Sequence, residues 1–151
     1  MGVTLSGLAF SIITRFMQQI FFFFFFSSER FINVSKDKMS WEEALNYCNS
    51  HQKTAGLLRI ESEGDQTETE QELKRQKISG PVWVGLRQSR LFGFWIWSSG
   101  LFVGPWTNWQ GGSEPEHETS HYCGALENKN GAFKWSDKDC RLKFRVLCEV
   151  K

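Results

Sequence analysis

Beyond residue 27 the spacing of apolar residues along this chain changes from helical to alternating, and each pattern predicts a secondary-structure element. The first helical pattern follows Ser40, which has Glu43 three residues later, as in a capping box. The apolar residues of this stretch recur at helical spacing and are Trp41, Ala44, Leu45 and Cys48. We therefore predict a helix from Trp41 to about Ser50 that buries this stripe.

The segment from Glu61 to Lys77 is highly polar and carries only a thin stripe of less polar positions. This pattern predicts a second, mostly solvated helix, which ends before Gly80-Pro81. The stripe consists of Gln66, Glu70, Leu73 and Ile78.

Runs rich in β-branched and aromatic residues predict the strands. They are Arg30–Val34, Val82–Leu86, Phe94–Trp97, Tyr122–Glu127, Ala132–Ser136 and Phe144–Glu149. Leu57–Ile60 is interpreted only as a short apolar link. Residues 98–121 contain Gly, Pro and Trp without periodicity, and so long a loop in a compact domain is usually functional. The predicted class is α+β.

Composition narrows the choice of partners. The chain has 18 Lys and Arg against 17 Asp and Glu, a formal net charge of +1, so no global field would steer it to nucleic acid or to a membrane. The length of 151 residues corresponds to one domain.

The four cysteines are an even number without a Cys-x-x-Cys pair, which argues against a zinc ribbon or a thioredoxin-type redox site. Four unrelated thiols and three disulfide pairings remain open on this evidence. Disulfides would imply an oxidising, extracellular or luminal setting.

Several motifs stand together with these cysteines. They are Val82-Trp83-Val84-Gly85-Leu86, Glu114-Pro115-Glu116, Trp135-Ser136-Asp137, Cys48, Cys123, Cys140 and Cys148. In this combination residues 28–151 resemble the C-type lectin-like domain in its short form. The resemblance implies two helices with two small antiparallel sheets and a long loop region. It also implies the disulfides Cys48–Cys148 and Cys123–Cys140, and a secreted protein or one on the extracellular face of the cell.

Sugar-binding members of the family hold Ca²⁺ in the long loop, and sugar hydroxyls complete its shell of oxygen ligands. Carried over by resemblance, Glu114 and Asp137 match family carboxylates, and Pro115 matches a turn proline that commonly follows a cis bond. Three other positions depart from the pattern. Glu116 stands in place of Asn or Asp, His121 in place of Glu and Ser136 in place of Asn, so both amide donors are lost.

We therefore predict a reduced calcium site that binds carbohydrate. Its residues are Glu114, Glu116, Asp137, Ser136 and His121, and the metal ligands are Glu114, Glu116 and Asp137. The alternative is a calcium-independent domain for a cell-surface protein ligand. A remote alternative is a zinc-dependent hydrolase that uses the H-E-x-x-H pentad at residues 117–121, but the flanking residues favour a loop rather than the helix this chemistry needs. We therefore do not expect this chain to be an enzyme.

Residues 1–27 are set apart from the domain, because an apolar stretch is interrupted by Arg15, Gln18 and Gln19 and followed by six Phe at 21–26. Three interpretations remain: a degenerate signal or anchor, an apolar segment packed on the domain, or a gene-model artefact that translates a pyrimidine-rich intron end. A membrane contact is expected only from a genuine anchor. Asn33-Val34-Ser35 is an N-glycosylation sequon, which agrees with secretion.

Overall fold

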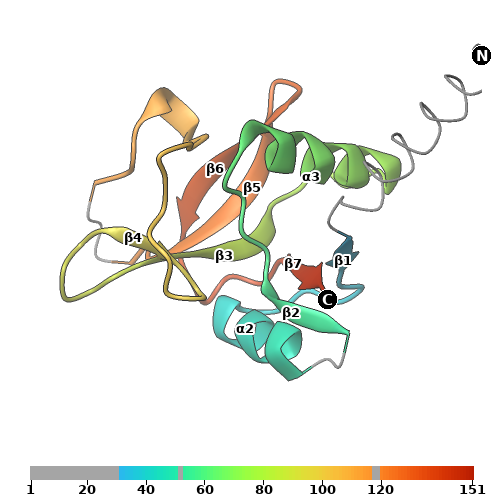
Figure 1. Cartoon of the computed structure of the whole chain (residues 1–151), viewed down its shortest axis with the longest axis horizontal. Helices are drawn as coiled ribbons and strands as arrows, with labels where there is room; N and C mark the ends of the chain where they lie inside the picture. Colours follow the sequence, from blue (N-terminus) through green and yellow to red (C-terminus); the bar gives the residue numbers. More distant parts are fainter. Residues whose placement is uncertain (1–30, 51–52, 117–119) are drawn as a thin grey trace, which may run out of the picture.

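The computed structural model describes residues 31–50, 53–116 and 120–151, and its strands form one twisted sheet with a helix at either side (Figure 1). The sheet has seven strands in the order β1-β7-β3-β5-β6, with β2 also paired to β7 and β4 also paired to β3. The strands are β1 (Ile32–Val34), β2 (Thr54–Leu57), β3 (Val82–Gln88), β4 (Trp95–Trp97), β5 (Cys123–Lys129), β6 (Ala132–Lys138) and β7 (Arg145–Val150).

The first helix, α2 (Trp41–Ser50), begins at the predicted capping box. The Glu43 N–H donates to the Ser40 hydroxyl at 3.2 Å, and the Ser40 N–H donates to the Glu43 carboxylate at 2.9 Å. Trp41, Ala44 and Cys48 form its buried face, as the spacing predicts. The Trp41 indole N–H also donates to the Val84 carbonyl at 2.9 Å, which fixes the helix on β3.

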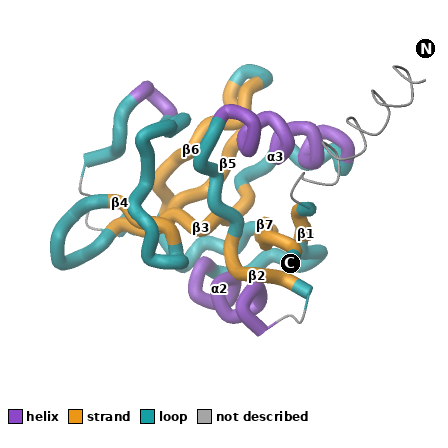
Figure 2. Tube along the Cα trace, in the orientation of Figure 1, coloured by secondary structure: helices purple, strands orange, loops and turns teal. Residues whose placement is uncertain are grey.

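The second helix, α3 (Glu63–Arg75), is capped by Ser62 and lies along the opposite edge of the sheet, close to β5 and β6 (Figure 2). Its buried residues are Gln66, Thr69 and Leu73, so the predicted stripe is correct at two of its helical positions, and Thr69 replaces Glu70. Gln66 is 5% exposed and joins the helix to the sheet. Its amide nitrogen donates to the Phe133 carbonyl at 3.0 Å, and its amide oxygen accepts from the Trp135 indole at 3.0 Å.

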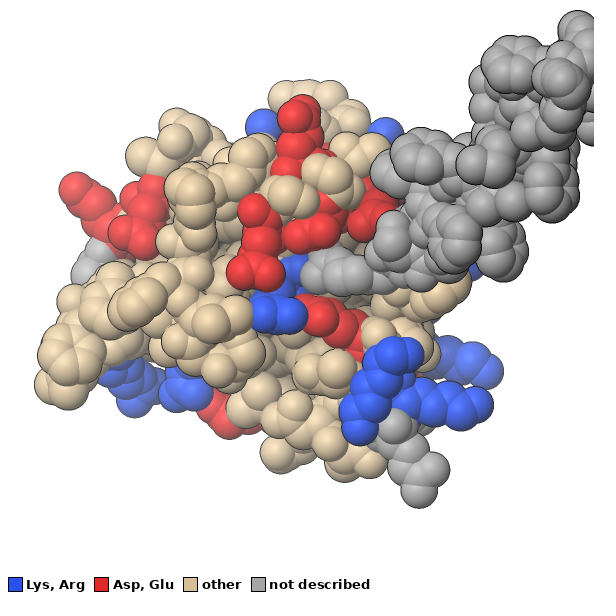
Figure 3. Space-filling view, in the orientation of Figure 1, with Lys and Arg blue, Asp and Glu red and all other residues tan. Residues whose placement is uncertain are grey.

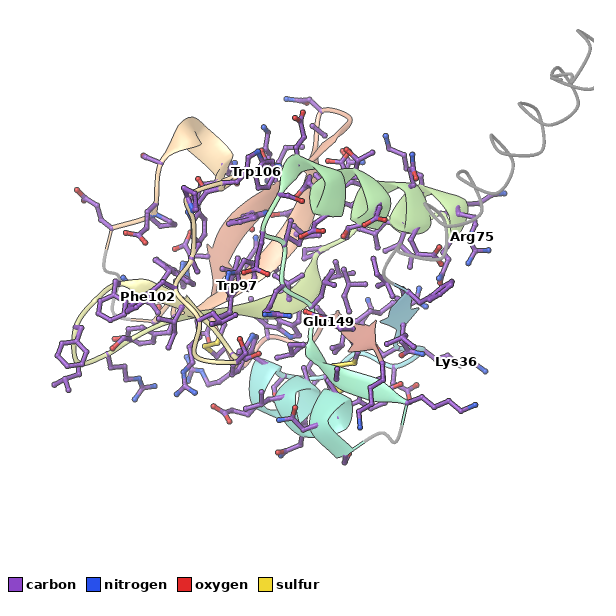
Figure 4. The ribbon with its side chains drawn as sticks, viewed as in Figure 1. Lys36, Arg75, Trp97, Phe102, Trp106 and Glu149 are labelled. Atoms are coloured by element: carbon purple, nitrogen blue, oxygen red, sulfur yellow. A yellow bond between two sulfur atoms is a disulfide. The ribbon has the colours of Figure 1, made fainter. Side chains whose placement is uncertain are left out.

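Indole rings fill the core between the sheet and the long loop. Trp135 lies at the centre of the group, with its ring centroid 5.6 Å from Trp97, 5.9 Å from Trp106 and 5.4 Å from Trp109. The backbone N–H of Trp135 donates to the Asn108 carbonyl at 3.0 Å, so the loop also follows the edge of β6. Trp97 and Trp106 point toward this region in Figure 4. The loop is therefore anchored through its tryptophans.

The disulfides Cys48–Cys148 and Cys123–Cys140 are present, as the resemblance implies, and no free cysteine occurs in the described residues. The first joins α2 to β7 and spans 100 residues of sequence. The second joins β5 to the turn after β6 and spans 17 residues.

The predicted α+β class and both helices are confirmed, but the sheet differs in one respect. Instead of two separate antiparallel sheets, β3 and β7 pair in parallel at Val82–Arg145 and Trp83–Val146, which connects the two halves into one mixed sheet. Strand β2 was missed, because its sequence Thr-Ala-Gly-Leu has no clear alternation. No helix in the described part of the chain is long and apolar enough to cross a membrane. Residues 1–27, and the predictions made for them, lie outside the described residues.

Candidate functional site

Asp137, the last of the predicted calcium ligands in the sequence, lies near the C-terminal end of strand β6. Phe133 and Trp135 point into the core, and Asp137 follows on the same face of the strand, where the core gives way to solvent. Asp137 lies opposite Gly124 of β5. A Cβ at Gly124 would collide with the side chain of Leu86, so glycine allows β5 and β3 to lie this close. Asp137 is thus paired with a strand that packs tightly against β3.

His121 contacts Asp137 directly. Its Nδ1 lies 3.3 Å from an Asp137 carboxylate oxygen, and the two side chains are 45% and 25% exposed. The structure therefore brings two residues of the predicted site into contact. Because an imidazole stands where the family pattern has an acid, one of the carboxylate's oxygens already faces a nitrogen rather than open space.

Glu114 and Glu116 lie in the long loop (residues 98–122) and are exposed, on either side of the half-buried Pro115. The loop reaches them through a short 3-10 helix, η1 (Gln110–Gly112), whose Gly111 has a φ of 84°. The cis peptide bond of the described residues precedes Pro105, at Gly104, and not Pro115.

Ser136 points away from solvent. It is 6% exposed, and its hydroxyl oxygen is buried without a hydrogen-bond partner in the structure. Alternation along β6 sends its side chain to the face opposite Asp137. The two neighbours in the Trp-Ser-Asp motif are therefore not brought together on one side of the strand.

Two charged residues that follow β6, Asp139 and Arg141, form an ion pair. Asp139 accepts from the Arg141 guanidinium at 2.8 Å and from the Arg141 backbone N–H at 2.9 Å, and these bonds lower its pKa from 3.8 to about 2. A surface cavity of about 340 Å³ adjoins this pair. It is lined by Arg90, Ser120, Tyr122, Asp139, Cys140 and Arg141. Sequence reasoning missed Arg90 and Arg141, because neither belongs to a family motif.

The described residues show no assembled calcium site. No group of three or more His, Cys, Asp or Glu side chains in residues 31–50, 53–116 and 120–151 is placed to hold a metal. Calcium needs six to eight oxygen ligands, whereas Asp137 is paired with His121 and the Ser136 hydroxyl is buried. The calcium ligation of Glu114, Glu116 and Asp137 stays a prediction.

Two further sequence predictions, the H-E-x-x-H pentad and the glycosylation sequon, remain to be placed. Residues 117–119 of the H-E-x-x-H pentad lie outside the described residues.

The sequon residue Asn33 lies in β1 opposite Cys148, with its side-chain oxygen buried and without a partner. The Ser35 hydroxyl of the same sequon is buried, donates to the Asp37 carbonyl at 2.7 Å and accepts from the Val146 N–H at 2.8 Å. Glycosylation at Asn33 stays a prediction.

Comparison with known proteins identifies the family. The family model of the lectin C-type domain matches residues 37–150. The C-type lectin lectoxin-Phi1 of Philodryas olfersii is 30% identical over 113 residues, which cover 75% of this chain and 72% of the relative. Human lithostathine-1-beta is 28% identical over 118 residues, covering 78% of this chain and 69% of the relative. The chain belongs to the C-type lectin domain family, and the family resemblance inferred from the sequence is confirmed.

Solved structures agree with this assignment. The crystal structure of human lithostathine superposes with a TM-score of 0.70 at 26% identity, covering 80% of this chain and 82% of that chain. The C-type lectin domain of murine dendritic cell inhibitory receptor 2, solved in complex with an N-glycan, has a TM-score of 0.66 at 22% identity and covers 80% of this chain and 89% of that chain. At that identity it shows the fold alone. Members of the family are non-enzymatic binding proteins, so the expectation of no enzyme is confirmed.

Proposed function

We propose that this chain is an extracellular recognition domain that binds carbohydrate through Asp137 and His121 near the end of β6 and through Glu114 and Glu116 of the long loop, by direct contacts and without a calcium ion. The family and the disulfides support the extracellular setting. The contact between His121 Nδ1 and the Asp137 carboxylate at 3.3 Å carries the proposal of calcium independence. It links the last family carboxylate to a nitrogen base, which is a poor ligand for a hard cation.

The chemistry of these residues suits sugar hydroxyls. Glu114 and Glu116 are exposed carboxylates that can accept hydrogen bonds, and Asp137 keeps one oxygen that His121 does not face. The imidazole of His121 is 45% exposed and can take part in the same contact. Hydrogen bonds to charged groups contribute about 1.5–3 kcal/mol each, so a few of them support binding in the millimolar to micromolar range.

The test is binding of the purified chain, with both disulfides formed, to a glycan array in calcium and in chelator. We expect the chain to bind the same glycans in both buffers. Asp137→Asn should weaken binding by about tenfold, because a neutral amide replaces the charged acceptor. Glu63→Gln is the matched control, since Glu63 is an exposed carboxylate on α3.

Each other outcome has a definite meaning. Retention that is lost in chelator would overturn calcium independence and restore the predicted calcium site of Glu114, Glu116 and Asp137. Titration of calcium followed by tryptophan fluorescence would then give its affinity. If the chain binds no glycan in either buffer, carbohydrate binding is overturned and the alternative ligand, a cell-surface protein, is favoured.

A further inference from the structure

An apolar surface lies at the end of the described structure that is opposite β1 and the C-terminal end of β7 (Figure 1). Its five side chains are all exposed and come from the β3–β4 loop and from the segment after β4. They are Leu91, 81% exposed, Phe92, 69%, Phe94, 38%, Leu101, 46%, and Phe102, 73%. We call these residues the apolar tip. Phe102 marks its position in Figure 4, and uncharged atoms cover this end of the molecule in Figure 3.

The three phenylalanine rings of the tip form a continuous row. The ring centroids of Phe92 and Phe94 are 5.7 Å apart, and those of Phe94 and Phe102 are 5.6 Å apart. Phe94 directly precedes β4, whose first residue, Trp95, points into the core. Large exposed apolar patches often mark interaction sites, so three phenylalanine rings in contact at the surface indicate a candidate binding surface.

Hydrogen bonds to one serine hold the tip away from the core. The Ser89 N–H donates to the Phe94 carbonyl at 2.8 Å, and the Gly93 N–H donates to the Ser89 carbonyl at 2.8 Å. The Phe92 N–H donates to the Ser89 hydroxyl at 3.1 Å. Gly93 has a φ of 82°, which favours glycine. The exposed side chains are therefore presented by an ordered turn.

The charged residues within the sequence segment that carries the tip are basic. From residue 87 to residue 102 the sequence contains two arginines and no acid. The Arg90 guanidinium lies 4.9 Å from the centre of the Tyr122 ring and makes no ion pair with any described residue. Arg87 lies 5.5 Å from the centre of the Trp41 ring and forms an ion pair with Glu42 at 3.9 Å, so Arg90 is the arginine of this segment that carries the positive charge of the flank. The tip therefore has an apolar summit and a cationic flank.

We propose that the apolar tip inserts into the interface of a lipid bilayer that contains anionic lipids, with Arg90 at the level of the headgroups. Apolar side chains flanked by Lys or Arg bind such interfaces through buried apolar area and attraction to anionic lipid. The protruding Leu91 and Phe92 need no complementary pocket in a fluid bilayer. A second copy of the chain is disfavoured, because a two-fold axis through the tip would bring the arginines of both copies together. This inference does not depend on carbohydrate binding.

The test is co-sedimentation of the full chain with vesicles of phosphatidylcholine alone and of equimolar phosphatidylcholine and phosphatidylserine. We expect binding to the anionic vesicles that weakens as salt is added. Phe92→Ser should reduce the partition coefficient by about tenfold or more, because an inserted phenyl ring is lost. Arg90→Gln should reduce it by about fivefold, from the loss of one positive charge at the surface.

Matched controls are available at the other end of the molecule. Phe31 is 66% exposed and lies beside β1, so Phe31→Ser removes the same side chain outside the tip. Lys36→Gln removes one exposed charge there, at the position labelled in Figure 4. Both controls should bind vesicles as the unchanged chain does. Equal losses in tip and control variants would overturn the proposal, as would no vesicle binding at all, which would point instead to an acidic protein partner.

Discussion

Gln66 connects helix α3 to the strand that carries Asp137, and its removal should destabilise the domain by a predictable amount. In Gln66→Leu the side chain keeps its volume, but the Trp135 indole N–H loses its acceptor at 3.0 Å in a residue that is fully buried. The Phe133 carbonyl keeps a second donor, the Asn108 amide at 3.0 Å, so it adds little to the cost. A buried donor without a partner costs about 1–3 kcal/mol, and we expect a loss of about 2 kcal/mol in the free energy of unfolding.

Urea unfolding followed by tryptophan fluorescence measures this loss. Gln71→Leu is the matched control, because Gln71 lies on the exposed face of α3 and should change stability by less than about 0.5 kcal/mol. In a Trp135→Phe background, which has no indole N–H, the effect of Gln66→Leu should fall below about 1 kcal/mol. If Gln66→Leu matches the stability of the unchanged chain, the assigned role of this hydrogen bond is wrong.

Three further predictions concern the frame around the candidate site. Replacing both Cys123 and Cys140 by Ser should lower the free energy of unfolding by about 3 kcal/mol, as the chain-entropy model gives for a loop of 17 residues, and equal midpoints in urea would contradict this. Gly124→Ala should cost about 1–3 kcal/mol through overpacking against β3, whereas an unchanged melting temperature would refute the close approach. The pKa of Asp139 is lowered from 3.8 to about 2 by Arg141, so its stabilising contribution is present above 3.8 and is lost as pH falls toward 2. Asp139→Asn should therefore flatten the acid side of the stability profile between those values, and an unchanged slope would contradict the assignment.

Local patterns predict the elements that short-range chemistry decides. The capping box at Ser40 and Glu43 and the apolar stripe of α2 depend on neighbours within one or two turns, and both are present. The parallel contact of β3 with β7 joins residues that are far apart in sequence, so no local pattern could reveal it. Strand β2 exists because β7 offers it an edge, not because Thr54–Leu57 has strong strand character.

The same distinction applies to the candidate site. Family resemblance assigns Asp137 and His121 to one site, and in the structure the two are in contact, since both flank the Cys123–Cys140 frame. It does not reveal that the Ser136 hydroxyl is buried, because that depends on how regularly β6 pairs with β5. Arg90 and the exposed phenylalanines lie outside every motif, so only the assembled surface shows that they stand together.

Strands β1 and β7 also have a practical consequence for handling the domain. Ile32 lies opposite Glu149, and the Val150 N–H donates to the Phe31 carbonyl at 2.9 Å, so the two strand ends emerge side by side. Strand β4 and the long loop lie at the far end of the molecule in Figure 1. Coupling to a biosensor chip through Lys151 would therefore leave both proposed binding surfaces facing the analyte, whereas random coupling through lysines would hide them in part of the immobilised population.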